Sequence, residues 1–347
     1  MINEKPPVVR AIDVGYGNTK YSSLIGAGDI QCGVFPSLAP QASAGPDLAS
    51  GLMQKRNTVV VDVQGVKYEV GKDARLAQDA THGRVLDPDY SMTNTHMALI
   101  KGALYYMGQP HIDLLVLGLP VNAIQKYEKK LAERVIGEHT IPSRHKDGEQ
   151  QQSVVTISNC RVIAQPIGAF FDYSLRAGLY ERMRTQTNLL IDIGYYTLDW
   201  IVAEGVKTIG ARSDAHNGGM SAVLRTMADA IGAELGEQIT DLSLLEEAIR
   251  TGANPYFYGK EFDITEHKKL GKAKAEQFVS VLVNKVGSSM DISNIILAGG
   301  GAEFFKDVLA DKFPKHDIIT TRDPVFANVR GFQRAGQQFI GQLMKRG

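Results

Sequence analysis

Apolar and polar positions follow strand and helix periods in turn along the chain. Val8 to Ile25 predicts two strands joined by a tight turn at Gly15 and Gly17, because glycine adopts positive φ without a Cβ clash. Asn57 to Gly71 predicts a second pair of strands. Between them, residues 41–57 are rich in Ala, Ser, Gly and Pro, and this composition indicates a surface loop.

Helix and buried-strand patterns continue through both halves of the chain. The first half contains a helix at Thr95–Met107, a buried strand at Leu114–Val121, an amphipathic helix at Ile124–Val135 and a polar stretch at His145–Gln152. The second half contains a hairpin at Asn188–Gly205, a strand at Asn294–Ala298, helices at Ser221–Ile231, Lys268–Val286 and Phe304–Phe313, and a final helix from Val329 onward. The order of these elements is typical of an α/β protein.

One short phrase occurs twice. AIDVGYGNTK, from Ala11 to Lys20, and LIDIGYYTLD, from Leu190 to Asp199, both carry Ile-Asp, one apolar residue and then Gly-Tyr. A chain of 347 residues exceeds the usual single core and favours two domains, so that each half holds one copy. The duplication predicts two related domains that close over one ligand.

Composition narrows the kinds of partner and compartment. Lys plus Arg equals Asp plus Glu at 38 each, so no basic surplus is present to coat a phosphate backbone. Direct, tight DNA binding by this chain alone is therefore disfavoured. Cys32 and Cys160 offer neither a metal quartet nor a disulfide framework, and the first ten residues lack the apolar run of a signal peptide. Since the longest apolar stretches are only of strand length, we expect a cytoplasmic protein without a membrane span.

The two hairpins carry chemistry suited to an anionic ligand. A turn without side chains lets backbone N–H groups approach an oxygen-rich group, and Asn18, Thr19 and Lys20 add an amide, a hydroxyl and a positive charge. Asp13 and Asp192 would repel a phosphate directly. Their natural partner is a hydrated Mg²⁺ that bridges carboxylates to phosphates, because Mg²⁺ gives up its waters reluctantly.

A third glycine element strengthens this interpretation. IILAGGGAEFF, from Ile295 to Phe305, predicts a buried strand, three glycines and a helix whose N-terminus is placed to face a nucleotide. Taken alone, Gly299 to Gly301 is more often a tight strand-to-helix turn, and a single Asp-x-Gly hairpin is common. Neither GxGxxG nor GxxxxGK[ST] occurs, so the usual nucleotide-binding folds are disfavoured.

Five elements in this order resemble the actin-like ATPases, and most of all the plasmid-segregating bacterial actins of the ParM type. They are AIDVGYGNTKY as a first phosphate loop, Val162–Tyr173 as a first connecting segment, LLIDIGYYTLDWIV as a second phosphate loop, LAGGGAEFF as an adenosine loop and Asp323–Gly331 as a second connecting segment. The resemblance implies an actin-like fold of two duplicated, ribonuclease H-like α/β domains around a nucleotide cleft. Residues 1–161, completed by a C-terminal helix at 324–347, would form the first domain, and residues 162–323 the second.

The resemblance also implies roles for single residues. Asp13 and Asp192 would hold the waters around Mg²⁺, and Asp192 would be catalytic together with Gln165. Gln165 precedes Pro166, where the family places a residue that orients the attacking water; an amide aligns water but is a poor base, so slow hydrolysis is expected. Gln165 could instead merely cap the helix that follows. Contacts to the nucleotide would come from Gly15, Gly17, Asn18, Thr19 and Lys20 around the phosphates, Gly194 and Thr197 on the γ-phosphate side, and Gly299, Gly300, Gly301 and Glu303 on the nucleoside side.

Two departures from the family pattern lie in the second hairpin. Tyr195 and Tyr196 occupy the turn where relatives often have glycine, serine or threonine, so the approach of the backbone to a γ-phosphate is expected to differ. Asp199 closes a Thr-Leu-Asp triplet, and its simplest role is to accept hydrogen bonds within the hairpin.

In function, the resemblance implies an ATPase, or a GTPase, that assembles head to tail into dynamic filaments. Such filaments would segregate plasmid DNA through a small DNA-binding adaptor at a centromere, in agreement with the neutral charge of this chain. Two alternatives from the same superfamily remain open: a non-polymerising ATPase switch and a small-molecule kinase. A kinase would need an acceptor pocket with a general base, for which the sequence offers no motif.

Overall fold

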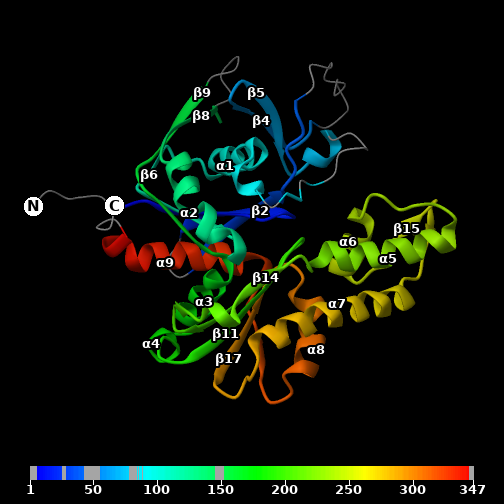
Figure 1. Ribbon diagram of the computed structural model, residues 1–347. Coiled ribbons are helices and arrows are strands. Elements are labelled where there is room, and N and C mark those ends of the chain that lie inside the picture. Colours follow the sequence, from blue (N-terminus) through cyan, green and yellow to red (C-terminus); the bar gives the residue numbers. More distant parts are fainter. Residues whose placement is uncertain are drawn as a thin grey trace, which may run out of the picture. The chain divides into compact units, whose positions relative to one another are not determined.

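The computed structural model describes residues 6–25, 29–42, 55–77, 84, 86–87, 89–144 and 152–343. Its contacts divide the chain into two compact units (Figure 1). Unit 1 comprises Met1–Leu175 and Asn328–Gly347, and unit 2 comprises Arg176–Ala327.

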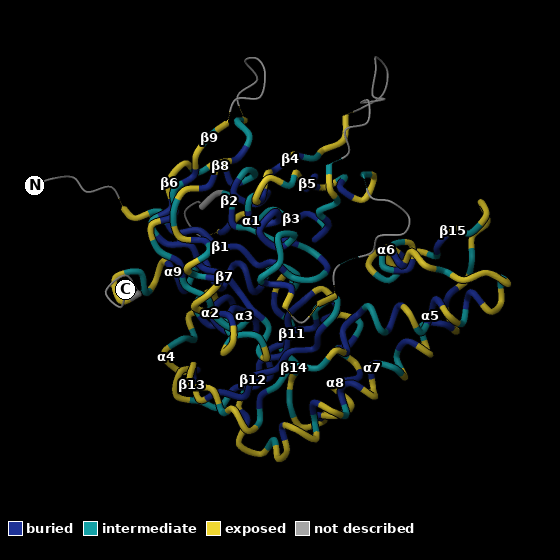
Figure 2. Tube along the Cα trace, turned by 45° about the horizontal axis from the view of Figure 1, so that its top comes forward, coloured by how far each residue is buried: buried dark blue, intermediate teal, exposed yellow. Residues whose placement is uncertain are grey.

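The described part of unit 1 is built on a five-stranded sheet in the order β10-β7-β1-β2-β3. Its strands are β1 (Val9–Val14), β2 (Asn18–Ile25), β3 (Ile30–Pro36), β7 (Leu114–Leu119) and β10 (Cys160–Ala164). β1 and β2 form the predicted antiparallel hairpin, while β7 lies parallel to both β1 and β10. β1 and β7 are buried throughout (Figure 2), as expected of strands covered on both faces.

Helices cover both faces of this sheet. α1 (Asn94–Met107) contributes Leu99 and Leu104 to a core that also contains Ile12 of β1. α9 (Ala327–Leu343) lies on the opposite face (Figure 1), where Gln333 donates a hydrogen bond to the carbonyl of Val9. The remaining elements of unit 1 are β4 (Thr58–Val63), β5 (Val66–Gly71), β6 (His111–Ile112), α2 (Val121–Val135), β8 (Gly137–Pro142), β9 (Gln152–Ile157), α3 (Gln165–Arg176) and the 3-10 helices η1 (Ala74–Ala77) and η2 (Tyr90–Met92).

Unit 2 is built on a second sheet in the order β13-β12-β11-β17-β18, with β14 paired to β12, among the residues described. Its strands are β11 (Thr187–Ile193), β12 (Leu198–Glu204), β13 (Lys207–Thr208), β14 (Asp214–His216), β17 (Ile292–Ala298) and β18 (Ile318–Thr320). β11 and β12 form the second predicted hairpin, and β17 lies parallel to β11 on its other side. The other elements are α4 (Tyr180–Met183), η3 (Gly210–Arg212), α5 (Met220–Leu235), α6 (Ser243–Thr251), β15 (Tyr256–Phe257), β16 (Lys260–Glu261), α7 (Thr265–Val286), α8 (Ala302–Lys312) and η4 (Pro324–Phe326).

The sheet of unit 2 packs one face against α5, α7 and α8. Trp200 of β12, Val223 of α5, Leu282 of α7 and Phe305 of α8 belong to one buried cluster. Side chains alternate between the two faces of a strand, so Ile191 and Ile193 point into this cluster while Asp192 points to the opposite face.

The predicted hairpins, helices and buried strands are confirmed, with shifts at their ends. α2 begins at Val121, three residues before the predicted start, because Pro120 takes the N-cap position and proline is tolerated at a helix start. α5, α7 and α8 likewise begin one to three residues early. Most of the predicted loop at 41–57 and of the polar stretch at 145–152 lies outside the described residues.

The units change over at residues 175 and 327, whereas the sequence placed domain boundaries at 161 and 323. The difference has a physical reason in α3. Asp172 of this helix bonds Arg330 of α9, and Phe171 lies against Phe339 with ring centroids 5.7 Å apart. These contacts bring the first eleven residues of α3 into unit 1.

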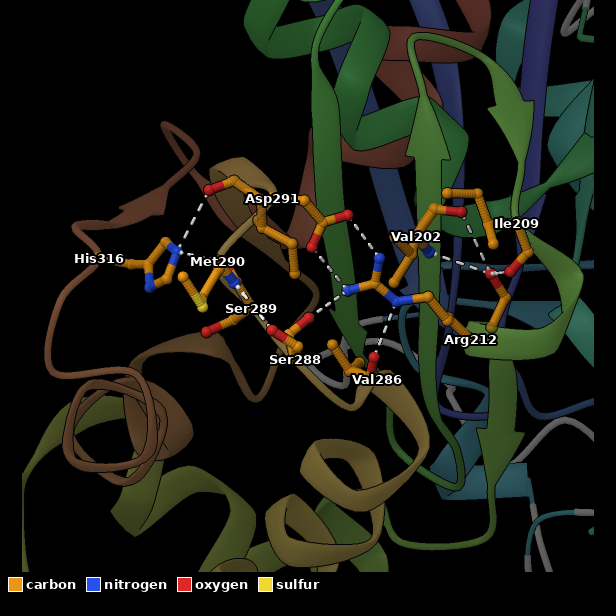
Figure 3. A network of polar contacts seen from close by, with 11 residues as sticks. Val202, Ile209, Arg212, Val286, Ser288, Ser289, Met290, Asp291 and His316 are labelled. Atoms are coloured by element: carbon orange, nitrogen blue, oxygen red, sulfur yellow. Dashed lines mark hydrogen bonds and ion pairs between the residues drawn. The ribbon is translucent and has the colours of Figure 1, made fainter.

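Arg212 fastens the segment between α7 and β17 (Figure 3). Its Nε donates to the carbonyl of Val286, 2.8 Å away, and its Nη1 pairs with Oδ2 of Asp291 at 2.6 Å. Because Val286 is the last residue of α7, Arg212 satisfies a carbonyl that the helix itself leaves unpaired. The network therefore fixes the path into β17, the strand that leads to the glycine turn.

None of the helices that the structure describes has the length and apolar content needed to cross a membrane.

Candidate functional site

Asp13 is the centre of a buried polar group in unit 1. Asp13 is 1% exposed, and both of its carboxylate oxygens accept hydrogen bonds. Oδ2 lies 3.1 Å from Nζ of Lys20, and Oδ1 lies 2.7 Å from Nε2 of Gln165. The antiparallel register of β1 and β2 places Asp13 directly opposite Lys20. Three of the predicted site residues, from β1, β2 and α3, are thus brought into contact.

Gln165 is the first residue of α3 and is 6% exposed. An ionised carboxylate can only accept hydrogen bonds, so the amide must face Asp13 with its Nε2. This orientation keeps Oε1 as an acceptor for another donor. The contact joins residues 152 positions apart, which weighs against a role limited to capping α3.

The turn of the first hairpin is held by its own backbone and by Ser37. The amide of Gly15 donates to the carbonyl of Asn18 at 3.2 Å, and the amide of Ser37 donates to the carbonyl of Gly17 at 2.9 Å. The hydroxyl of Ser37 donates to the carbonyl of Gly15 at 2.6 Å. Thr19 is fully buried with its hydroxyl 2.9 Å from that of Ser37, which indicates that it supports the turn from behind.

Tyr16, at the tip of the same turn, makes long-range contacts that the sequence did not suggest. Its ring stacks on that of Tyr90 with centroids 4.9 Å apart, and its hydroxyl donates to the carbonyl of Asp87 at 3.0 Å. Tyr90 in turn meets the ring of His96 edge-on at 5.3 Å. A tyrosine between two glycines was the only signal available, and its partners lie more than 70 residues away.

His96 gives the unfolding free energy of the protein a measurable pH dependence. Burial, and secondarily the Arg134 guanidinium, lower the pKa of His96 to about 3, so the folded protein keeps it neutral. In the unfolded chain, His96 binds a proton near pH 6.5. The contribution of neutral, buried His96 to the unfolding free energy is therefore complete above about pH 6.5 and declines as the pH falls toward 3. From pH 7.5 to 5.5 we expect the unfolding free energy of the wild type to fall about 1.4 kcal/mol more than that of His96→Phe. Urea unfolding at both pH values measures the change in unfolding free energy. In the control variant His111→Phe, at an exposed site, the unfolding free energy should fall as much as in the wild type. Equal falls in the wild type and in His96→Phe would contradict the prediction.

The second hairpin places Asp192 at the corresponding position in unit 2. Asp192 is buried near the end of β11, directly opposite Asp199 of β12, so both carboxylates lie on the same face of the sheet. The sequence had assigned Asp199 only a structural role. The amide of Gly194 donates to the carbonyl of Thr197 at 2.9 Å and closes the turn, while the amide of Ser221 in α5 donates to the carbonyl of Tyr195 at 2.6 Å. The two-tyrosine turn is therefore fixed to the first turn of α5.

The glycine turn lies beside this second hairpin. Gly299 has a φ of +91°, and a Cβ there would lie 2.3 Å from Oδ1 of Asp192, so no other residue fits. The amide of Gly301 donates to the carbonyl of Ile193 at 3.0 Å. Gly301 is the N-cap of α8, and Glu303 lies in its first turn. Unit 2 thus places these residues at the ends of β11, β12, β17 and α8: Asp192, Gly194, Thr197, Gly299, Gly300, Gly301 and Glu303.

The carboxylate of Asp13 is suited to hold a hydrated cation through water. Among the described residues, no group of three or more His, Cys, Asp or Glu side chains is placed to hold a metal ion. The carboxylate of Asp13 has about four acceptor positions, of which Lys20 and Gln165 occupy two, so it can still accept from metal-bound water. Mg²⁺, which keeps several waters, fits such a site. Burial raises the pKa of each of the Cys32 and Cys160 thiols to about 12, so both stay protonated at neutral pH.

Comparison with known families and structures gives matches over nearly the whole chain. The family model of the actin-like proteins N-terminal domain matches residues 11–168, and that of the archaeal actin homologue MreB-like, C-terminal, matches residues 190–311. No curated protein sequence matches.

Solved structures with the same fold share few residues with this chain. An archaeal actin homologue in complex with ADP is 20% identical with a TM-score of 0.75, and the alignment covers 95% of this chain and 99% of that one. ParM from a 15-stranded filament of Clostridium botulinum is 20% identical with a TM-score of 0.73, covering 96% and 100%. Bacillus thuringiensis ParM with AMPPNP is 14% identical with a TM-score of 0.66, covering 99% and 100%. Identities this low establish the fold and leave the activity to be argued from the residues.

Proposed function

The chain belongs to the actin-like proteins, with the fold that its motifs predicted, and from this premise we propose that it is a nucleotide-hydrolysing filament protein that segregates plasmid DNA. ATP, or GTP, would be its substrate, Mg²⁺ its cofactor and the cytoplasm its location. The observation that carries the proposal is the buried contact of Gln165 and Lys20 with Asp13. It unites an acceptor for water, a positive charge and a carboxylate at the mouth of a glycine turn.

The residues of the two hairpins would divide the work of binding. Lys20 and the backbone around Gly15, Gly17 and Asn18 would contact the phosphates, with Thr19 holding the turn in place. Gly194 and Thr197 would contact the γ-phosphate side, and Gly299 to Gly301 with Glu303 the nucleoside side at the start of α8. The archaeal homologue solved with ADP supports a nucleotide as the ligand of this fold.

Hydrolysis would depend on the orientation of Gln165. Asp13 holds the Nε2 side of the amide, so Oε1 would accept a hydrogen bond from the attacking water and align that water with the phosphorus. An amide takes up no proton at neutral pH, so alignment without a strong base would give slow turnover. Mg²⁺, held through waters by Asp13 and Asp192, would neutralise charge on the phosphate oxygens.

Assembly would use a heterologous contact, which propagates because it does not close into a ring. If the triphosphate state associates tenfold more strongly than the diphosphate state, each added subunit gains about 1.4 kcal/mol, and hydrolysis then destabilises the polymer. The ParM filament among the structural neighbours supports self-association. The neutral charge of this chain supports a separate DNA-binding adaptor as the link to the plasmid.

Light scattering and phosphate release, followed together after addition of Mg·ATP, test the proposal. We expect scattering to rise above a critical protein concentration and to decay as phosphate appears, with EDTA abolishing both signals. Phosphate release with flat scattering at every concentration would instead favour a non-polymerising switch or a kinase. No signal in either channel, with ATP or GTP, would contradict the nucleotide site.

A further inference from the structure

Two helices of unit 1 touch backbone to backbone close to Gln165. A Cβ on Gly331 of α9 would lie 1.7 Å from the carbonyl oxygen of Gly168 in α3, and a Cβ on Gly168 would lie 2.6 Å from the carbonyl oxygen of Asn328. Glycine is therefore required on both helices at this crossing. The contact leaves little room for one helix to slide along the other.

A buried ion pair fixes the same crossing one turn after Gly168 along α3. Asp172 of α3 is 0% exposed and accepts hydrogen bonds from both Nη2 and Nε of Arg330. Nη2 lies 2.8 Å from Oδ2, and Nε lies between the two oxygens, 3.1 Å from Oδ2 and 3.2 Å from Oδ1. Nε of Arg334 lies 3.3 Å from Oδ1. A bidentate guanidinium–carboxylate pair restricts orientation as well as distance.

α9 is itself tied to the strand that carries Asp13. Gln333 donates through Nε2 to the carbonyl of Val9 at 3.1 Å and accepts through Oε1 from the hydroxyl of Ser22 at 2.8 Å. That same hydroxyl oxygen accepts from the amide of Ala11, two residues before Asp13, at 2.9 Å. A continuous set of contacts thus runs from β1 through α9 to Asp172.

Gln165, Gly168 and Asp172 follow one another at spacings of three and four, which places them on one face of α3. Any rotation of α3 about its axis would move Gln165 together with the other two. We propose that Arg330 is a positioning residue, which sets the rotation of α3 through Asp172 and so holds the Gln165 amide against Asp13. The inference rests on the proposed role of Gln165 in aligning water.

A double-mutant cycle tests this inference. Arg330→Lys keeps the charge and removes the bidentate fork, and a displacement of about 1 Å at a reacting group can cost up to 100-fold in rate. We expect Arg330→Lys to lower kcat for ATP hydrolysis about tenfold, with KM within about twofold of the wild type. In a Gln165→Ala background, Arg330→Lys should change kcat less than about twofold, because no amide remains to be positioned.

Several outcomes would overturn the inference. They are an equal loss of kcat from Arg330→Lys in both backgrounds, a rise in KM alone, and wild-type kinetics. The single variant Gln165→Ala separates this failure from that of the proposed function: if it leaves kcat unchanged, the role of Gln165 itself is wrong and both fall.

Two further variants complete the test, one as a control and one as a substitute for Arg330→Lys. Arg334→Lys keeps the positive charge beside the same carboxylate and has only a single contact to change, so kcat should stay within about twofold of the wild type. Asp172→Glu retains the charge but displaces the carboxylate, and it should reproduce the non-additive loss if Arg330→Lys does not fold. Thermal unfolding of each variant shows which of them fold.

Discussion

We expect Asp13→Asn to lower kcat for nucleotide hydrolysis at least about 100-fold. This loss corresponds to a rise of about 2.7 kcal/mol in the activation free energy. The aspartate accepts from Lys20 and Gln165 at the same time. Asparagine has one acceptor oxygen and an NH₂ donor, so it can satisfy only one of these two donors and carries no charge for a hydrated cation. Both the alignment of Gln165 and the hold on Mg²⁺ are lost together.

Steady-state phosphate release at saturating Mg·ATP measures this effect. The matched control is Asp62→Asn near the end of β4, where the residue is exposed and Oδ1 accepts from the amide of Gly65 at 3.0 Å. Asparagine retains that acceptor, so kcat should stay within about twofold of the wild type. An Asp13→Asn protein that is folded, as judged by its thermal unfolding, and still turns over within tenfold of the wild type would remove Asp13 from the site.

Gln165→Ala lowers kcat about 100-fold while nucleotide affinity stays within about threefold. The reason is geometric: Oε1 is the acceptor left over after Nε2 bonds to Asp13, and alanine supplies neither group. Because hydrolysis destabilises the polymer, we also expect filaments of this variant to persist longer than those of the wild type.

Single-turnover phosphate release and the affinity for a fluorescent ATP analogue separate the two effects. Gln125→Ala on α2, where the side chain is exposed, serves as the control and should leave both quantities unchanged. Loss of nucleotide affinity without an effect on the bound-state rate would instead assign Gln165 to binding or to the integrity of α3.

Local patterns were sufficient for most of the elements. The hairpins β1–β2 and β11–β12 and the buried strand β17 each span six or more residues with a clear apolar run, and their turns carry the glycines that tight backbone requires. The elements that escaped prediction include the longer β3, β8, β9 and α6. They also include short elements, such as β18 with three residues and the two-residue strands of the β15–β16 hairpin. So few positions cannot establish a period of two, and their pairing is decided by the neighbouring strand.

The sequence by itself determined the α/β class, the duplicated aspartate hairpins, the glycine turn at Gly299 to Gly301 and, through their order, the actin-like fold. These features are written in runs of adjacent residues, where periodicity and glycine placement act directly on the backbone. Only the tertiary structure decided that Gln165 faces Asp13 with its nitrogen and that Asp172 is clasped by Arg330, across 152 and 158 residues of chain. Contacts at that separation depend on how whole helices and sheets pack, and packing follows from the shape and polarity of many residues together, which no single stretch of sequence contains.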